Sequence, residues 1–388
     1  MKQLIRERKA LTEARRIVVK IGSRVLVQKS GRPDTRRIRQ LVKDLARLRK
    51  DGREVVVVSS GAIGSGMEAL RMKARPTTLP ELQMAAAVGQ LRLMATYDRL
   101  FGAEKCRIGQ VLLTHDDLKD RRRHLNARNS MMALLRNGII PIVNENDVVA
   151  VDEIKFGDND LLAALVALLI EADLLILLTT VDGFRAKGAG GRTKRVGVLR
   201  NVTASELAMA QGKGSDISTG GMASKLQAAY MVARVSSPAV IADGRTAGTL
   251  MRIVKGEDVG TLVAAELAGA QAMLAGRKRW IAFFHKAQGT LVVDEGARAA
   301  IETRGRSLLP IGIREVEGHF ASGTVVNLRT TQGVLFACGL VDYSSEQIRK
   351  IKGHKTTEIQ DILGAKDYDE VIHRDNMVVL GVDGGGTT

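Results

Sequence analysis

Short apolar segments alternate with longer amphipathic segments through the first two-thirds of the chain. The short segments are rich in Val, Ile and Leu and lack polar alternation, which is typical of strands buried on both faces of a sheet. We expect such strands at residues 17–19, 54–58, 139–143, 174–178 and 239–242. Helical periodicity predicts helices at residues 34–50, 80–100, 120–137, 159–171 and 221–232. This alternation predicts an α/β fold, a three-layer αβα sandwich with a mainly parallel sheet.

The pattern changes after residue 261. A helix-like segment at 264–274 leads into short strands with glycine-rich turns, expected at residues 289–293, 311–316, 323–328 and 334–340. This change predicts a separate small β-rich domain. We divide the chain into a basic N-terminal extension (1–14), a large α/β domain (15–268), a linker (269–276) and the small domain (277–388).

The composition is that of a globular protein. The 388 residues are enough for two folded domains, and 45% of them are hydrophobic and 26% charged. Aromatic residues make up only 3%, which disfavours a dedicated single-strand nucleic-acid binder. The net charge of +17 has two interpretations, a nucleic-acid surface or a solvated basic surface on a protein that handles anionic ligands. We favour the second.

The two cysteines, Cys106 and Cys338, lie far apart and belong to no CxxC motif or His-bearing cluster. Neither a zinc site nor a disulfide framework is therefore indicated. The basic N-terminus is not followed by the apolar core of a signal peptide, and the longest apolar run, 161–170, is too short to span a bilayer. We expect a cytoplasmic protein without a membrane partner.

Two glycine-rich turns follow predicted strands. In the first, Lys20 lies at the end of a buried strand beside Gly22, where it could reach a transferring phosphoryl group. Taken alone, a lysine extending from a strand end to solvent is the better explanation. The second turn, 58–66, carries serines that can bind a carboxylate, and its glycine spacing does not match the Rossmann fingerprint. Each turn is a weak signal by itself.

Two clusters of Asn and Asp, at 144–147 and 157–160, lie where a strand ends and where an apolar helix begins. Such residues also serve as turn formers and N-caps, but two clusters so close together favour a functional site. A further glycine turn, 218–225, enters a helix with Lys225 in its first turn. A cation there opposes the helix dipole and indicates an anionic partner. The spacing is not that of a Walker motif, which disfavours P-loop kinases and protein kinases.

Taken in order, the segments 19–23, 59–62, 144–147, 157–160 and 219–225 resemble the glutamate 5-kinase family of the amino acid kinase superfamily. The small domain resembles a PUA domain at residues 289–296 and 307–313. Acetylglutamate kinase, aspartokinase, carbamate kinase and UMP kinase are the nearest alternatives, and none typically carries a PUA domain. An RNA-binding PUA protein is the alternative from a different class.

The resemblance implies a role for each candidate residue. Lys20 and Lys225 would stabilise the transferring phosphoryl group, and Asp160 would hold the two lysines in position. The resemblance also implies glutamate binding by Ser60, Asp147 and Asn159. The ATP site would comprise Lys20, Thr179, Thr180, Thr219, Gly220, Gly221, Met222, Ala223, Ser224 and Lys225. ATP and Mg²⁺ are the implied cofactors, with no metal ligands assigned to the protein.

The implied reaction makes glutamyl 5-phosphate in the first step of proline synthesis. The family is commonly inhibited by proline, and we expect a homo-oligomer. RNA binding through the PUA-like domain stays open as a second activity. The chain departs from the family pattern beside the nucleotide, where Thr180 replaces the usual Asp and residues 184–189 replace the usual loop.

Overall fold

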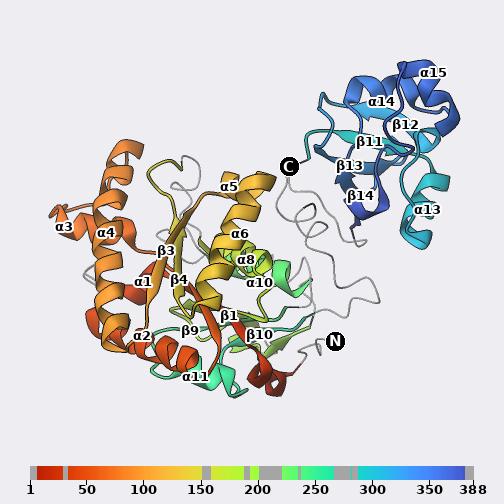
Figure 1. Cartoon of the computed structure of the whole chain (residues 1–388). Helices are drawn as coiled ribbons and strands as arrows, with labels where there is room; N and C mark the ends of the chain where they lie inside the picture. Colours follow the sequence, from red (N-terminus) through yellow and green to blue (C-terminus); the bar gives the residue numbers. More distant parts are fainter. Residues whose placement is uncertain are drawn as a thin grey trace. The chain divides into compact units, whose positions relative to one another are not determined.

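The chain divides into two units, Met1–Met273 and Leu274–Thr388, in the computed structural model (Figure 1). The structure describes residues 7–28, 34–150, 159–187, 193–200, 221–234, 237–265, 281 and 287–380. The expected linker, 269–276, and most of the helix expected at 264–274 lie outside the described residues.

A parallel sheet forms the centre of the first unit. Its described strands follow the order β3-β4-β2-β1-β5-β9-β10-β8, and β10 runs antiparallel to β9. Their bounds are β1 Arg16–Ile21, β2 Glu54–Val58, β3 Ile108–Leu113, β4 Ile140–Glu145, β5 Leu174–Thr179, β8 Val198–Leu199, β9 Ala239–Asp243 and β10 Thr261–Val263. The five predicted strands are present. Strands β3, β8 and β10 were not predicted, because β3 is only partly buried and carries no continuous apolar run, and β8 and β10 are only 2 and 3 residues long.

Helices cover both faces of this sheet, which confirms the three-layer αβα sandwich (Figure 1). One face packs against helices α2 (Thr35–Lys50), α4 (Leu79–Ala103) and α11 (Thr249–Val254) in a shared apolar core. The other packs against α6 (Arg121–Arg136), α8 (Asn159–Leu169) and α10 (Met222–Ala233). Shorter helices α1 (Ser23–Leu26), α3 (Ala62–Ala69) and α5 (His115–Lys119) follow strands, and β6 (Arg185–Lys187) pairs with β7 (Thr193–Arg195).

Helix α8 is buried on almost every side, because its residues from Leu162 to Leu169 are all at most 5% exposed. This burial explains its uninterrupted apolar sequence. Among the described helices, none is long and apolar enough to cross a membrane.

The described part of the basic N-terminal extension packs on the first unit. It contains a 3₁₀ helix, Arg8–Glu13, whose Leu11 is wholly buried in the core. The Arg8 guanidinium donates hydrogen bonds of 2.7 Å to the carbonyl oxygens of Val259, Gly197 and Gly260. These contacts tie the start of the chain to the segments that lead into β8 and β10.

The second unit is built on a smaller, mostly antiparallel sheet, which confirms the β-rich C-terminal domain. Its described strands follow the order β12-β11-β13-β14-β15, with β11 and β13 parallel. The strand bounds are β11 Thr290–Val293, β12 Ile313–Glu317, β13 Val325–Thr330, β14 Leu335–Leu340 and β15 Met377–Val379. Helices α13 (Glu295–Arg304), α14 (Ser345–Ile351) and α15 (Ile359–Leu363) complete it. Short 3₁₀ helices lie at Pro310–Gly312, Thr356–Glu358 and Arg374–Asn376.

Candidate active site

The candidate site lies at the carboxyl ends of the parallel strands β1, β2, β4 and β5. In a parallel sheet these ends share one edge, so residues from distant parts of the sequence meet there. Lys20 is the penultimate residue of β1, Ser59 and Ser60 follow β2, Asn144 is penultimate in β4, and Thr179 ends β5. Helices α8 and α10 add Asn159, Asp160 and Lys225.

Asp160 joins the two candidate catalytic lysines. Its Oδ1 lies 2.5 Å from Nζ of Lys20, and its Oδ2 lies 2.9 Å from Nζ of Lys225. Asp160 is wholly buried and each lysine is only 5% exposed. Burial acts to raise the pKa of the Asp160 carboxyl, but the two ammonium groups outweigh burial and lower this pKa to about 2. The carboxylate is therefore ionised at neutral pH and holds both cations side by side.

The start of α10 is fixed to the same carboxylate. The Ser224 hydroxyl lies 3.1 Å from Oδ2 of Asp160 and 2.9 Å from the carbonyl oxygen of Gly221. Met222 and Ala223 form the first turn of α10. Thr219 and Gly220, also predicted to bind ATP, lie outside the described residues. The described part of the predicted loop thus lies beside the lysine cluster.

Asn159 connects the lysine cluster to the serine turn after β2. Its Nδ2 donates to the carbonyl oxygen of Ser59 at 2.7 Å and lies 3.1 Å from Oγ of Ser60. The same amide group donates to Oδ1 of Asn144 at 2.9 Å. The predicted substrate residues Ser60 and Asn159 are therefore in direct contact.

Asp147 lies in the turn after β4 and is half-buried. Its carboxylate has no hydrogen bond or ion pair with any described residue, and it does not join the Asn159 network. Burial and, next, the nearby charge of Glu145 raise the pKa of Asp147 to about 7, against the opposing effect of Arg75. Glu145 is 5% exposed, and its Oε1 lies 3.5 Å from Nδ1 of His115.

Thr179 and Thr180 end and follow β5, between the ends of β1 and β9. Both are half-buried, and the Thr179 carbonyl oxygen accepts a hydrogen bond of 2.8 Å from the Gly244 amide. Among the described residues, no hydrogen bond links either threonine side chain to the lysine cluster. The segment that departs from the family pattern begins at the buried Phe184 and continues into β6, which pairs with β7.

The described residues do not form a metal cage. Within the described ranges, no group of three or more His, Cys, Asp or Glu side chains is placed to hold a metal ion. The carboxylate of Asp160 is already bound to two ammonium groups. Mg²⁺ in kinases is commonly held by substrate phosphates together with only one or two protein carboxylates.

Sequence reasoning missed two residues that adjoin this site. Tyr97 is buried on α4, and its hydroxyl lies 3.0 Å from Oγ of Ser59. Gln90 follows the buried Gly89 on the same helix, and its Oε1 accepts a 2.8 Å hydrogen bond from Nδ2 of Asn144. In the sequence, a polar residue of an amphipathic helix that faces a site looks the same as a polar residue that faces solvent. Only the fold therefore reveals Tyr97 and Gln90 as neighbours of the site.

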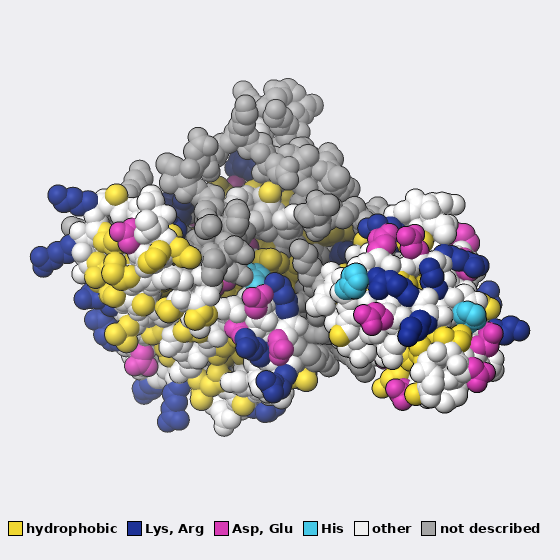
Figure 2. All heavy atoms as spheres, turned by 90° about the horizontal axis from the view of Figure 1, so that it is seen from above, with side chains coloured by type: hydrophobic (Ala, Val, Ile, Leu, Met, Phe, Trp, Pro, Cys, Tyr) yellow, Lys and Arg dark blue, Asp and Glu magenta, His cyan; other side chains and the backbone are white. Residues whose placement is uncertain are grey.

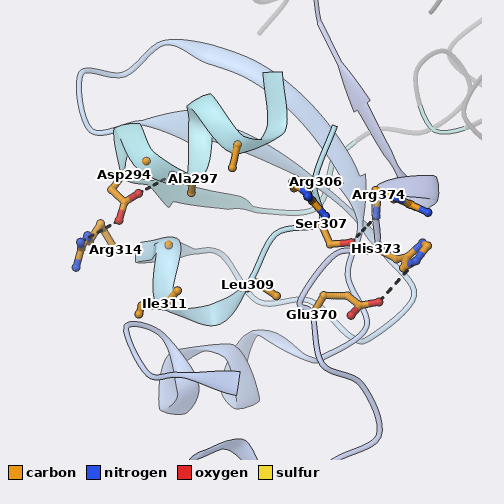
Figure 3. Close-up of a pocket in the computed structure, with 13 residues that line it drawn as sticks. Asp294, Ala297, Arg306, Ser307, Leu309, Ile311, Arg314, Glu370, His373 and Arg374 are labelled. Carbon is orange, nitrogen blue, oxygen red and sulfur yellow. Dashed lines mark hydrogen bonds and ion pairs between the residues drawn. The ribbon is translucent and has the colours of Figure 1, made fainter. Parts of the chain in front are cut away.

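A cavity lies in the C-terminal unit (Figure 3). This cavity of about 790 Å³ lies between α13, the segment before β12 and the segment before β15. Arg306 and Arg374 line it together with the exposed apolar side chains of Leu309 and Ile311. Arg314, also in the lining, is paired with Asp294 at 2.9 Å. The lining thus combines cationic groups and apolar surface with two carboxylates, of which Asp294 pairs with Arg314 and Glu370 pairs with His373.

Comparison with known proteins matches both units. The amino acid kinase family matches residues 15–243, and the PUA domain matches residues 289–363. Glutamate 5-kinase of Citrifermentans bemidjiense is 48% identical over 374 residues, which are 95% of this chain and 99% of that protein. Glutamate 5-kinase of Moorella thermoacetica is 47% identical over 378 residues, which are 96% of this chain and 98% of that protein. The chain belongs to the amino acid kinase family and, within it, to the glutamate 5-kinases.

Proposed function

We propose that the site at the carboxyl ends of β1, β2, β4 and β5 transfers the γ-phosphoryl group of ATP to the γ-carboxylate of L-glutamate. The product is L-glutamyl 5-phosphate, formed in the first step of proline biosynthesis. The observation that carries this assignment is the buried cluster in which Asp160 holds the ammonium groups of Lys20 and Lys225 side by side. Two adjacent cations in a dry site suit a reaction whose transition state is an anionic phosphoryl group.

The chemistry needs no general base. The side-chain carboxyl of glutamate has a reference pKa of about 4.3 and is ionised at neutral pH. One carboxylate oxygen attacks the γ-phosphorus, the bond from that phosphorus to the bridging oxygen breaks, and ADP leaves with the electron pair. Lys20 and Lys225 neutralise charge on the transferring group, while Asp160 keeps both ammonium groups in place.

The proposed glutamate site extends from the lysines toward the turn after β4. Ser60 would donate its hydroxyl hydrogen to the substrate, and Asn159, whose NH₂ group already donates to Ser59 and Asn144, would accept with its Oδ1. Asp147 would accept from the α-ammonium group, because its carboxylate is half-buried and unpaired among the described residues. This assignment distinguishes free glutamate from N-acetylglutamate, which lacks the ammonium.

The proposed nucleotide site lies on the opposite side of the lysines. It comprises Thr179 and Thr180 at the end of β5, and the loop from Thr219 to Lys225 that leads into α10. Mg²⁺ bound to the ATP phosphates would supply further positive charge. Ser224 supports this assignment, because its contacts with Asp160 and Gly221 tie the start of α10 to the catalytic cluster.

An assay of ADP release with the purified chain tests the proposal. Glutamate, N-acetylglutamate, aspartate, carbamate and UMP are offered in parallel with Mg²⁺ and ATP. We expect release with glutamate to exceed release with every other acceptor. A preference for any of the other four would refute the assignment of substrate.

Proline inhibition extends the proposal. Proline shares an α-carboxylate and a charged amino group with glutamate but has no γ-carboxylate to phosphorylate. It could therefore occupy the Asp147 side of the site without reacting. We expect proline to raise the apparent KM for glutamate. Inhibition that is independent of the glutamate concentration would place proline elsewhere.

A homo-oligomer is also proposed, on the basis of exposed apolar side chains. Leu91 is 75% exposed and Met84 is 46% exposed, both on α4, and Leu112 on the edge strand β3 is 37% exposed. Figure 2 shows hydrophobic side chains gathered on the surface of the larger unit. Apolar patches of this kind commonly mark protein interfaces. Light scattering of the purified chain at several concentrations measures its assembly state directly.

RNA is a second candidate ligand, favoured by the cavity of the PUA domain. Arg306 and Arg374 have no ion pair with any described residue, so both can meet phosphate groups. Leu309 and Ile311 offer apolar surface against which a base can pack. Gel-shift titration with RNA at physiological salt should show binding that weakens when both arginines are replaced by alanine. Unchanged binding by that variant would exclude the cavity as the RNA site.

A cytoplasmic location is proposed from the cysteines. Cys106 and Cys338 are both free thiols, and Cys338 is buried. Burial raises the pKa of the Cys338 thiol to about 12, which keeps it protonated and unreactive. Free thiols are usual in the reducing cytoplasm, where ATP is also available. Fractionation of cells that express the chain tests this location.

A further inference from the structure

A chain of side-chain amides runs from the catalytic cluster to helix α4. Nδ2 of Asn159 donates to the carbonyl oxygen of Ser59 at 2.7 Å and to Oδ1 of Asn144 at 2.9 Å. Nδ2 of Asn144 in turn donates to Oε1 of Gln90 at 2.8 Å. The two asparagines thereby connect α4 to the start of α8.

The direction of every hydrogen bond in this chain is fixed. A backbone carbonyl oxygen can only accept, so the atom of Asn159 that faces Ser59 must be the NH₂ group. Asn144 must then present its oxygen to Asn159, and its own NH₂ group must face Gln90. Gln90 accepts with its oxygen, which leaves its NH₂ group as the free end of the chain.

This free end is a buried donor without an acceptor. Nε2 of Gln90 is inaccessible to solvent and has no hydrogen-bond partner among the described residues. Native proteins seldom leave a buried amide donor unsatisfied, so this atom indicates an acceptor beyond the described residues, and a bound substrate can supply it. The requirement is for an acceptor oxygen, and a carboxylate is the strongest one available to a small substrate.

Two glycines hold Gln90 beside the substrate turn. A Cβ on Gly89 would lie 1.7 Å from the carbonyl oxygen of Ala62, and a Cβ on Gly66 would lie 1.7 Å from the carbonyl oxygen of Ala85. Only glycine at both positions lets α4 cross so close to α3. Gln90 therefore lies next to the first turn of α3, which directly follows Ser60 and Gly61.

Gln90 also lies at the end of the amide chain that is remote from the lysines. Asn159 is adjacent to Asp160, and Gln90 is reached from Asn159 through two successive hydrogen bonds. The γ-carboxylate of glutamate must lie at the lysines to receive the phosphoryl group. The α-carboxylate, on the same carbon as the ammonium group, must lie at the remote end.

We propose that Gln90 is a specificity-determining residue whose amide NH₂ group donates a hydrogen bond to the α-carboxylate of the amino-acid substrate. This inference rests on the proposed function. It adds a residue from α4 to the substrate site. It also assigns recognition of the α-carboxylate, for which the residues predicted from the sequence include no dedicated donor. A substrate without that carboxylate loses this contact.

The substitution Gln90→Glu tests the proposal because it separates the two functions of this side chain. One glutamate oxygen can still accept from Asn144, so the amide chain is preserved. The other oxygen replaces the NH₂ group and opposes the substrate carboxylate with a like charge. We expect the KM for glutamate to rise at least about tenfold, equivalent to about 1.4 kcal/mol, with kcat and the KM for ATP within about twofold of wild type.

A second variant and a second ligand keep the test decisive. Gln90→Met removes the donor without adding charge, and it should raise the KM for glutamate less than Gln90→Glu does. Inhibition by 4-aminobutyrate, which has the ammonium group but no α-carboxylate, should not weaken in Gln90→Glu relative to wild type. An unchanged KM for glutamate in Gln90→Glu would mean that Gln90 only orients Asn144, or that water satisfies its donor. A fall in kcat with no change in KM would point to disturbed catalytic geometry and would also overturn the proposal.

Turnover by the wild-type chain separates a failure of the proposed function from a failure of the role of Gln90. If the wild-type chain does not phosphorylate glutamate, the proposed function fails and the role of Gln90 falls with it. If the wild-type chain is active and Gln90→Glu retains its KM for glutamate, only the inference about Gln90 fails.

Discussion

Replacing Asp160 by Asn should destabilise the first unit and slow catalysis together. Asn has nearly the same shape but no charge, so it leaves the two ammonium groups close together in a site where each lysine is 5% exposed. Removing one partner of a buried ion pair typically costs about 3–5 kcal/mol, because the remaining charge is uncompensated. Here two contacts of 2.5 and 2.9 Å are lost, so we expect a loss within that range or above it.

The effect should depend on pH in a defined direction. The pKa of Asp160 in the folded chain is lowered to about 2, below its reference value of about 3.9 in an unfolded chain. Its contribution to stability is therefore fully present above pH about 4 and is lost as the pH falls toward 2. The wild-type chain should keep its full advantage over Asp160→Asn at pH 7 and lose it in that acidic range.

Urea denaturation measures the free energy of unfolding, and steady-state kinetics measures kcat. We expect kcat to fall on the order of 10²-fold or more, because the lysines lose the group that aligns them. Asp116→Asn is the matched control, since Asp116 also pairs with a lysine at 2.9 Å but is 79% exposed. That control should change stability by at most about 1 kcal/mol. A loss of less than about 1 kcal/mol in Asp160→Asn, with normal kcat, would refute the role assigned to the cluster.

Four further outcomes are expected. Lys20→Ala and Lys225→Ala should each lower kcat on the order of 10²-fold or more, with much smaller effects on the KM for glutamate in steady-state assays. The pKa of Asp147 is raised to about 7, so this carboxyl becomes neutral as the pH falls below 7. We therefore expect kcat/KM for glutamate to decline over that range, and the pH profile of Asp147→Asn should lack this decline. Arg8→Ala removes three hydrogen bonds to backbone carbonyl oxygens and leaves that of Val259 without its donor, so urea denaturation should show a loss of about 1–3 kcal/mol. Truncation near residue 276 should leave a soluble kinase, since the two units have separate cores; an inactive product would show that the second unit is needed.

The sequence was sufficient wherever structure follows from local pattern. Continuous apolar runs predicted β1, β2, β4, β5 and β9, because strands buried on both faces cannot contain exposed polar positions. Glycine turns and Asx clusters after these strands indicated most of the residues that meet at the candidate site, since parallel strands bring their carboxyl ends to one edge. The edge strand β3 and the short strand β15 escaped prediction because partial burial and short length leave no distinct pattern.

The motifs identified which residues to consider, but the contacts among them depended on the tertiary structure. Lys20 and Lys225 lie at nearly opposite ends of the first unit in sequence, and one carboxylate binds both only because β1, α8 and α10 meet at the sheet edge. Gln90 has no local feature that indicates function. Its free NH₂ group follows from a chain of hydrogen bonds across α4, β4 and α8, ending at one backbone carbonyl. Such contacts depend on strand order and helix crossing, and these are set by the packing of the whole unit rather than by the residues next to Gln90.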